Sequence, residues 1–344
     1  MVILRGISPI DMVKWTGLHF AGLLAFTGAI AALYHFNLIS IGIPWLSVSI
    51  IGTAVAFYVG FKNNQAYDRM WEARKIWGGI VNDSRAWGMM VDGYVTNQFA
   101  KSPSSASELH QVKQKLIYRH IAWLYAHRSQ LLVPTPWEHI SQGGHTTKLI
   151  QRYQKELGVG LVDDEITRTE LKLFLPPEEH DRLINHVNTA TQIINQQSRD
   201  LTKLRAQNLI DDFRHTQMED VLRSFYTLQG KNERIKKFPL PRQYANMSRY
   251  FVAIFIILLP FSMIPELMKI GDWGLWLSIP ITALIGWVYV MMEVVGDYSE
   301  NPFQGMPNDI PMMALCRVIE IDLREMLGET DLPPKVEAKN GVLM

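Results

Sequence analysis

The chain has almost no cysteine and almost no excess of charge. Cys316 is the only cysteine among 344 residues, so the chain forms no internal disulfide and has no cysteine-rich metal site. The formal net charge is +1, from 34 lysine and arginine residues against 33 aspartate and glutamate residues. This balance favours no class of partner, so function has to be sought in the distribution of residues along the chain.

Sequence signatures of common enzyme classes are also absent. The chain has no glycine-rich phosphate loop, no GxSxG elbow, no HExxH motif and no Rossmann fingerprint. His180 and His186 lie near Glu178 and Glu179, but residues six apart share no helix face, so we expect no metal site there. The basic residues of 231–249 directly precede an apolar run, which favours lipid head groups over nucleic acid. We therefore expect no enzyme, no cofactor and no nucleic-acid partner.

Long apolar runs are what the chain does have. They occupy residues 15–34, 39–61, about 250–267 and 273–292. A helix of roughly 20 residues crosses a bilayer core of about 30 Å, because each residue rises about 1.5 Å. The N-terminus lacks the short apolar region and cleavage site of a signal peptide, so we expect the first run to be retained. The runs predict four transmembrane helices.

Polar sequence with helical periodicity separates the two pairs of runs. Residues 62–248 contain no run long enough to span a membrane and no β-branched alternation, and we expect long helices at 178–207 and 211–235. We predict an all-α membrane protein with four transmembrane helices per subunit and a large helical cytoplasmic domain. Its parts are an N-terminal lead and hairpin at 1–61, the helical domain at 62–248, a second hairpin at 249–295 and a C-terminal tail at 296–344. We expect the last ten residues to be disordered.

Basic residues predict the orientation of the four helices. Lys269 is the one lysine or arginine in the hairpin connections at 35–38 and 266–272, whereas the opposite side carries many lysines and arginines. Cytoplasmic loops are enriched in these residues. We therefore expect both termini and the helical domain to face the cytoplasm.

The second apolar run carries two neighbouring stripes when it is drawn as a helix. The first consists of Thr53, Phe57 and Phe61, and the second of the small residues Gly52, Ala56 and Gly60. Small residues let membrane helices approach closely, so we expect the second stripe to pack on a neighbouring subunit. A ring of aromatic side chains makes a hydrophobic constriction that can gate by dewetting. Several subunits in a ring would be needed to enclose a pore. Ordinary core packing is the alternative explanation of the phenylalanines.

Three segments carry a resemblance to a known family. They are FKNNQAYDRMWEARKIWG at 61–78, LQGKNERIKKFPLPRQY at 228–244 and ENPFQGMPNDIPM at 300–312. In order and placement they resemble the bestrophin family in its bacterial branch, and the similarity covers nearly the whole chain. The resemblance implies a homopentameric ion channel of the bacterial inner membrane. Its partners would be its own copies, membrane lipid and permeant monovalent ions, with one pore on the five-fold axis.

The resemblance also implies which residues line the pore. The family has a hydrophobic neck on the second membrane helix, and the motif at 67–69 places it at Thr53, Phe57 and Phe61. Familiar members have a large aliphatic residue at the first position, so a threonine ring here should wet more easily. The family's second constriction, the cytoplasmic aperture, falls on Phe213. Ile210 and Gln217 are the alternatives one turn away, and helix packing is the alternative role.

Calcium binding is a property of animal bestrophins, which use an acidic cluster after an NPF motif. In this chain QGMPND follows Asn301–Phe303, and Asp309 is the one acid in that run. Calcium prefers about 6–8 oxygen ligands with several carboxylates. We therefore predict no metal site and no calcium gating. Asn301 and Asp309 are the weak candidates, with a structural turn and helix cap as their other role.

Together with the apolar runs, the resemblance therefore implies a passive ion channel that conducts chloride or other monovalent ions through a pentameric pore gated at the neck. The neck carries no charge and does not select the sign of the ion. A secondary transporter is the alternative, although Glu266 and Glu293 lie at span ends rather than in mid-membrane. A soluble or peripheral helical scaffold, with the four apolar runs as its buried core, is a third possibility.

Overall fold

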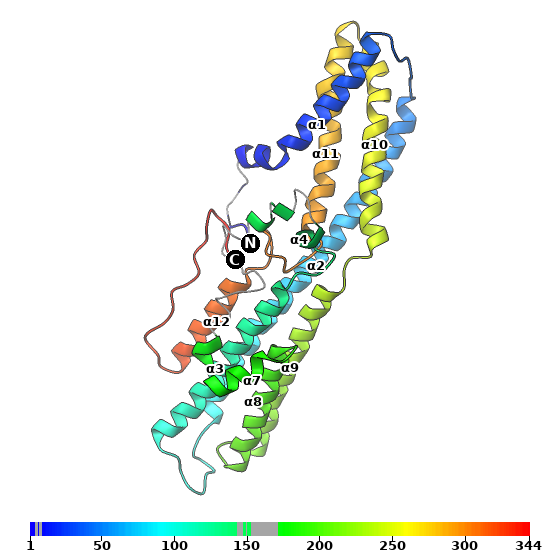
Figure 1. The fold of residues 1–344 in the computed structure, drawn as a ribbon. Coiled ribbons are helices and arrows are strands. Elements are labelled where there is room, and N and C mark those ends of the chain that lie inside the picture. The colour runs from blue at the N-terminus through cyan, green and yellow to red at the C-terminus, as the bar shows by residue number, and fades with distance from the viewer. Residues whose placement is uncertain (4–5, 7–8, 143–146, 149, 153–170) are drawn as a thin grey trace. The chain divides into compact units, whose positions relative to one another are not determined.

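The structure is a computed structural model that describes residues 1–344 except 4–5, 7–8, 143–146, 149 and 153–170 (Figure 1). The described residues are mainly α-helical, and β-structure among them is limited to two isolated bridges, which confirms the predicted all-α fold. The helices are α1 (Pro9–His35), α2 (Trp45–Tyr94), α3 (Ala106–Leu132), α4 (His139–Gln142), α7 (Pro177–Ile184), α8 (Thr189–Ala206), α9 (Asp212–Lys237), α10 (Arg242–Met268), α11 (Trp273–Ser299) and α12 (Met312–Met326).

Four of these helices are long and apolar enough to cross a membrane. They are residues 15–35 of α1 together with α2, α10 and α11, as the apolar runs predicted. α2 is a continuous helix of 50 residues, and no proline lies between its first and last residue. Prolines do lie inside α10 and α11, where neighbouring helices in a membrane protein satisfy the freed backbone groups.

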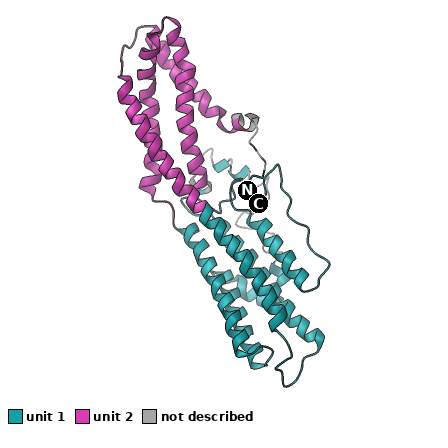
Figure 2. Cartoon of the chain, turned by 180° about the vertical axis from the view of Figure 1, so that it is seen from behind, with its two compact units in different colours: residues 1–3, 71–238, 302–344 teal, residues 4–70, 239–301 magenta. Residues whose placement is uncertain are grey.

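The chain divides into two compact units, which Figure 2 distinguishes by colour. The membrane-helix unit consists of residues 4–70 and 239–301. The helical unit consists of residues 1–3, 71–238 and 302–344. α2 contributes residues to both units.

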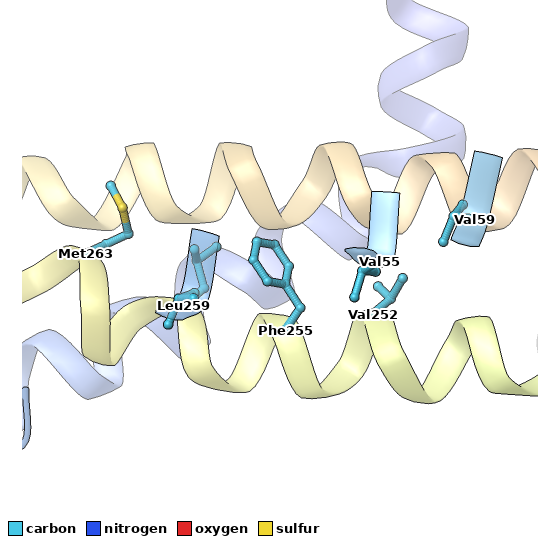
Figure 3. Packing of buried hydrophobic residues seen from close by; sticks show 7 residues of the cluster. Val55, Val59, Val252, Phe255, Leu259 and Met263 are labelled. Carbon is cyan, nitrogen blue, oxygen red and sulfur yellow. The ribbon is translucent and has the colours of Figure 1, made fainter. Parts of the chain in front are cut away.

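One side of α2 is buried inside the membrane-helix unit. Val55 and Val59 share a hydrophobic cluster with Val252 and Phe255 of α10 (Figure 3). Gly52 allows this approach, because a Cβ atom there would lie 2.7 Å from Cε2 of Phe255. Gly52 therefore packs within its own chain, contrary to the expectation that the small stripe packs on a neighbouring subunit.

Aromatic and histidine side chains are part of the core of the helical unit. The ring of His127 stacks on Trp123 with centroids 5.7 Å apart, and the His120 ring lies 4.4 Å from Phe225. Both histidines are buried, and His120 Nε2 lies 2.9 Å from the hydroxyl of Ser84. Burial disfavours the charged imidazolium and lowers the pKa of His120 to about 3 and that of His127 to about 4. The core of this unit thus contains two neutral histidines.

Arg119 joins three helices of the helical unit. Its guanidinium donates to both carboxylate oxygens of Glu179 on α7, at 2.6 and 2.9 Å, and pairs with Asp200 on α8 at 2.9 Å. Burial alone would lower the pKa of Arg119, but these two carboxylates outweigh it and the pKa is raised. Because the Arg119 side chain is buried, the two carboxylates compensate a charge that would otherwise be costly.

Side-chain caps explain where several helices begin. Ser105 and Glu108 form a capping box at α3, in which each side chain accepts a hydrogen bond from the other residue's backbone N–H. Asn188 caps α8 by accepting from the N–H of Thr191 at 2.9 Å. This cap marks a new helix start, so the single helix that we predicted over 178–207 is wrong: α7 ends at Ile184 and α8 begins at Thr189.

The last residues of the chain pair with the first. The N–H of Ile3 donates to the carbonyl of Gly341, and the N–H of Leu343 donates to the carbonyl of Met1, both at 2.9 Å. The N–H of Ala314, in the first turn of α12, donates to the carbonyl of Met344 at 2.9 Å. The expectation of a disordered terminus is therefore wrong, because backbone hydrogen bonds hold this segment.

Candidate pore-lining site

The three predicted neck residues lie on one exposed face of α2. Phe57 is 65% exposed and Phe61 is 63% exposed, and Thr53 is exposed as well. Val55 and Val59 are buried and each lies two residues from a phenylalanine, which is about 200° around a helix. The phenylalanines therefore point away from the bundle to which their own helix belongs.

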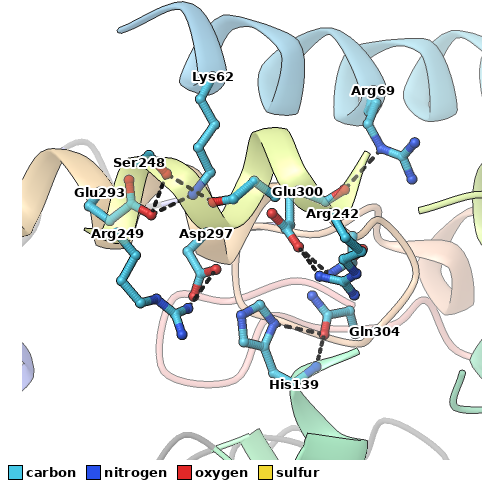
Figure 4. A network of polar contacts seen from close by, with 12 residues as sticks. Lys62, Arg69, His139, Arg242, Ser248, Arg249, Glu293, Asp297, Glu300 and Gln304 are labelled. Carbon is cyan, nitrogen blue, oxygen red and sulfur yellow. Dashed lines mark hydrogen bonds and ion pairs between the residues drawn. The ribbon is translucent and has the colours of Figure 1, made fainter. Parts of the chain in front are cut away.

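The residue directly after Phe61 belongs to a buried ion pair. Lys62 is 0% exposed, and its Nζ atom lies 2.6 Å from Oε1 of Glu293 on α11 (Figure 4). The hydroxyl of Ser248, on α10, donates to the same oxygen at 2.9 Å. In the sequence, Lys62 directly follows the second apolar run and Glu293 directly follows the fourth, so neither residue stands out. The missed signal was the spacing of Lys62 from Val55 and Val59, which continues the buried stripe of α2.

A second set of polar contacts surrounds the C-terminal end of α11. Arg242, the first residue of α10, lies 3.3 Å from the carboxylate of Glu300, and the Nε of Arg69 donates to the backbone carbonyl of Glu300 at 3.0 Å (Figure 4). Arg249 and Asp297 approach at 3.4 Å. These contacts fasten α2 and α10 to the end of α11.

The candidate aperture residue Phe213 is the second residue of α9 and is 84% exposed. Its neighbour Arg214 donates to the carbonyl of Tyr94 at 3.2 Å, which holds the start of α9 against the end of α2. Of the two alternatives, Ile210 is buried, and Gln217 accepts a hydrogen bond from the hydroxyl of Tyr94 at 2.7 Å. Phe213 is thus the exposed apolar residue of the three.

The two weak metal candidates are both used inside the chain. The carboxylate of Asp309 accepts hydrogen bonds from the N–H groups of Phe303, Gly305 and Ile310 at 3.0, 2.9 and 2.7 Å. Burial raises the pKa of this carboxyl, against the opposing effect of the three donors. Asn301 is buried and donates to Glu300 at 3.3 Å.

Metal ligands do not gather elsewhere in the part of the chain that the structure describes. No group of three or more histidine, cysteine, aspartate or glutamate side chains is arranged there to hold a metal ion. The oxygens of Asp309 instead stabilise a tight loop in which Phe303 and Gly305 have positive φ angles of 71° and 78°.

Comparison with known proteins gives consistent matches over most of the chain. Residues 13–325 match the family described as bacterial/fungal bestrophin protein. Two relatives are similar over nearly their whole length. The voltage-dependent anion channel-forming protein YneE of Escherichia coli strain K12 is 25% identical over 317 residues, which cover 91% of this chain and 88% of that protein. The voltage-dependent anion channel-forming protein RSc3414 of Ralstonia nicotianae is 26% identical over 318 residues, with 92% and 88% covered.

The fold is similar to that of a solved structure. The crystal structure of a bacterial bestrophin homologue from Klebsiella pneumoniae superposes with a TM-score of 0.68 at 19% identity, covering 91% of this chain and 98% of the other. The family match spans all four membrane helices, α12 nearly to its end and the residues considered above as neck and aperture. The chain therefore belongs to the bestrophin family, in its bacterial and fungal branch.

Proposed function

We propose that this protein is a passive channel for small monovalent anions such as chloride. Two relatives that align over about nine-tenths of this chain are named as voltage-dependent anion channel-forming proteins, which supports anions as the permeant species. The family assignment and the four apolar helices support a membrane channel rather than an enzyme.

The pore is formed by five copies of the chain around one axis. The observation that carries this proposal is the pair of phenylalanines exposed on α2, opposite a face that the chain buries itself. An aromatic stripe left uncovered on a membrane helix is explained when several copies of that helix face one another. Thr53, Phe57 and Phe61 then form three successive rings, and the aromatic rings close the pore by excluding water.

A second constriction lies at the cytoplasmic exit, where Phe213 projects from the start of α9. Its side chain is exposed, and the hydrogen bond from the neighbouring Arg214 to Tyr94 fixes the backbone at the start of α9. The position of the Phe213 ring is therefore defined by a fixed backbone.

Both termini face the cytoplasm of a bacterial inner membrane. The excess of lysine and arginine on one side of the four helices supports this orientation. The backbone bridge between Val2 and Val342 agrees with it, because it brings the two ends of the chain together.

Two measurements test this proposal, namely the mass of the purified protein and its ion current in planar bilayers. The protein purified in detergent is expected to have the mass of five chains, and in planar bilayers with a chloride gradient its reversal potential is expected to follow chloride. A single-chain mass without current would contradict the proposal. Saturable flux coupled to a second ion would support a secondary transporter instead.

A further inference from the structure

The ion pair between Lys62 and Glu293 lies in the membrane-helix unit, and Lys62 directly follows Phe61 in the chain. Lys62 is 0% exposed and Glu293 is 6% exposed, and their charged atoms are 2.6 Å apart. Burying two charges among apolar helices is costly, and their pairing offsets only part of that cost. Ionisable residues inside membrane bundles are rare and commonly serve function. The pair therefore requires an explanation beyond packing.

The geometry of α2 connects this pair to the neck. Successive helix residues are 100° apart, so turning α2 enough to move Lys62 off Glu293 turns the Phe61 side chain by the same angle. The buried apolar contacts of α2 in this unit come from valines, and such contacts have little directional preference. A hydrogen-bonded ion pair has a preferred direction and length, so it defines one rotation of the helix.

A second contact beside the pair fixes the position of α2 along its axis. The Asn63 side chain donates to the carbonyl of Met292 on α11 at 2.8 Å. The same side chain lies against Gly296, where any Cβ atom would clash with its Oδ1 atom. Two successive residues of α2, Lys62 and Asn63, are therefore both fastened to α11.

We propose that Lys62 and Glu293 are positioning residues of the channel gate. The pair keeps α2 in the rotation that turns Phe61 away from its own subunit and toward the conduction axis. The hydrogen bond from Ser248 to Glu293 and the hydrogen bond from Asn63 to Met292 support the pair. This inference rests on the proposed function, since it assumes that Phe61 forms a ring on that axis. It assigns a gating role to two side chains that touch neither the ion nor the pore.

Glu293→Gln tests the proposal most directly. Glutamine keeps the shape and an acceptor for Ser248 but removes the charge that Lys62 faces, so α2 gains access to other rotations. We expect the open probability in planar bilayers to rise roughly 5–30-fold, the population shift that a modest loss of interaction produces in a two-state equilibrium. Reversal of both charges, Lys62→Glu with Glu293→Lys, is expected to return the open probability toward that of the parent.

Asp297→Asn is the matched control. Asp297 lies one turn beyond Glu293 on α11, and its pair with Arg249 is longer, at 3.4 Å, and more exposed. We expect this variant to gate like the parent. An Asp297→Asn response equal to that of Glu293→Gln would overturn the proposal, because it would reflect general loosening of α11.

A Phe61→Ala background separates a positioning role from a merely structural one. If Lys62 and Glu293 act through Phe61, Glu293→Gln adds no further change there, whereas independent effects would add. Additive effects would overturn the proposal. If Glu293→Gln fails to assemble, the neutral pair Lys62→Met with Glu293→Gln leaves no unpaired charge and is measured in its place.

The two levels of inference fail in different ways. A parent that conducts and responds to Phe61→Ala, combined with unchanged gating in assembled Glu293→Gln, overturns the positioning role alone. A parent that passes no ions overturns the channel function and the positioning role together.

Discussion

Thr53 donates its hydroxyl hydrogen to the backbone carbonyl of Ser49, one turn earlier on α2, at 2.9 Å. Threonine in a helix commonly makes this bond. The exposed side chain therefore presents a methyl group and an oxygen that can still accept hydrogen bonds. In the proposed pore, the Thr53 side chains of the five copies form one ring. Each of these side chains offers permeating water a hydrogen-bond acceptor but no hydroxyl donor.

Thr53→Val is expected to lower the conductance. Valine has nearly the same shape but lacks the acceptor, so it lengthens the apolar part of the neck and makes the pore harder to wet. Single-channel recording in planar bilayers measures the change. Thr282→Val on α11 is the control, because that hydroxyl is buried and has no hydrogen-bond partner among the described residues. Conductance above the parent level in Thr53→Val would contradict the wetting argument.

Phe57→Ala and Phe61→Ala are expected to raise the conductance by about an order of magnitude, since each removes a ring from a hydrophobic constriction. Both side chains are exposed in the subunit, so its fold should tolerate the change. The same recordings measure the result. Phe57→Leu keeps an apolar side chain and serves as the control, with conductance closer to that of the parent. Unchanged currents in both alanine variants would rule out the neck at these positions.

Phe213→Ala is expected to change the current–voltage relationship without affecting stability. The side chain is 84% exposed, and substitutions at exposed positions usually alter the free energy of unfolding by no more than about 0.5 kcal/mol. Bilayer recordings at both voltage polarities and thermal unfolding in detergent measure the two effects. Val187→Ala, an exposed apolar residue between α7 and α8, is the control. Identical currents in Phe213→Ala and Val187→Ala would remove Phe213 from the pore.

Acidification is expected to destabilise the protein through His120 and His127. In the unfolded chain these rings bind protons near pH 6.5, whereas in the folded chain burial delays protonation to a pKa of about 3 for His120 and about 4 for His127. The unfolded state therefore binds more protons as the pH falls below 6.5. Each ring lowers the free energy of unfolding by up to about 1.4 kcal/mol per pH unit, until its folded pKa is reached.

Thermal unfolding in detergent at about pH 7.5 and about pH 5 measures this effect. His120→Gln is expected to reduce the pH dependence of the free energy of unfolding by the contribution of one bound proton. This holds whatever the substitution does to stability at neutral pH. His110→Gln, at an exposed position near the start of α3, is the control. An unchanged pH dependence in His120→Gln would show that this ring is not the group that titrates.

Calcium is expected to leave the current unchanged, because both oxygens of Asp309 already accept backbone hydrogen bonds within its loop. Bilayer currents with a chelator and with calcium up to about 1 mM, the range of weak protein sites, make the comparison. A calcium-dependent current that disappears in Asp309→Asn would show that a site exists there after all.

The membrane helices and the exposed stripe of α2 could be predicted because they depend on local pattern. Thr53, Phe57 and Phe61 recur every four residues, and the structure places them on one face. The break before α8 was also readable, since Asn188 is a typical cap, but the long polar run around it suggested one helix.

Contacts between distant segments could not be predicted in the same way. Lys62 and Glu293 are 231 residues apart, and each looks like an ordinary charge at the end of an apolar run. Gly52 belongs to a stripe of small residues, but only the position of Phe255 determines that it packs within its own chain. The pairing of residues 1–3 with the last residues uses backbone atoms, which any sequence offers.

That terminal pairing has a practical consequence. Because Val2 bridges to Val342, two halves of a split fluorescent reporter attached to the two ends would meet within a single subunit. Fluorescence would then arise without contact between copies, so such a fusion measures folding of the individual chain and not its assembly.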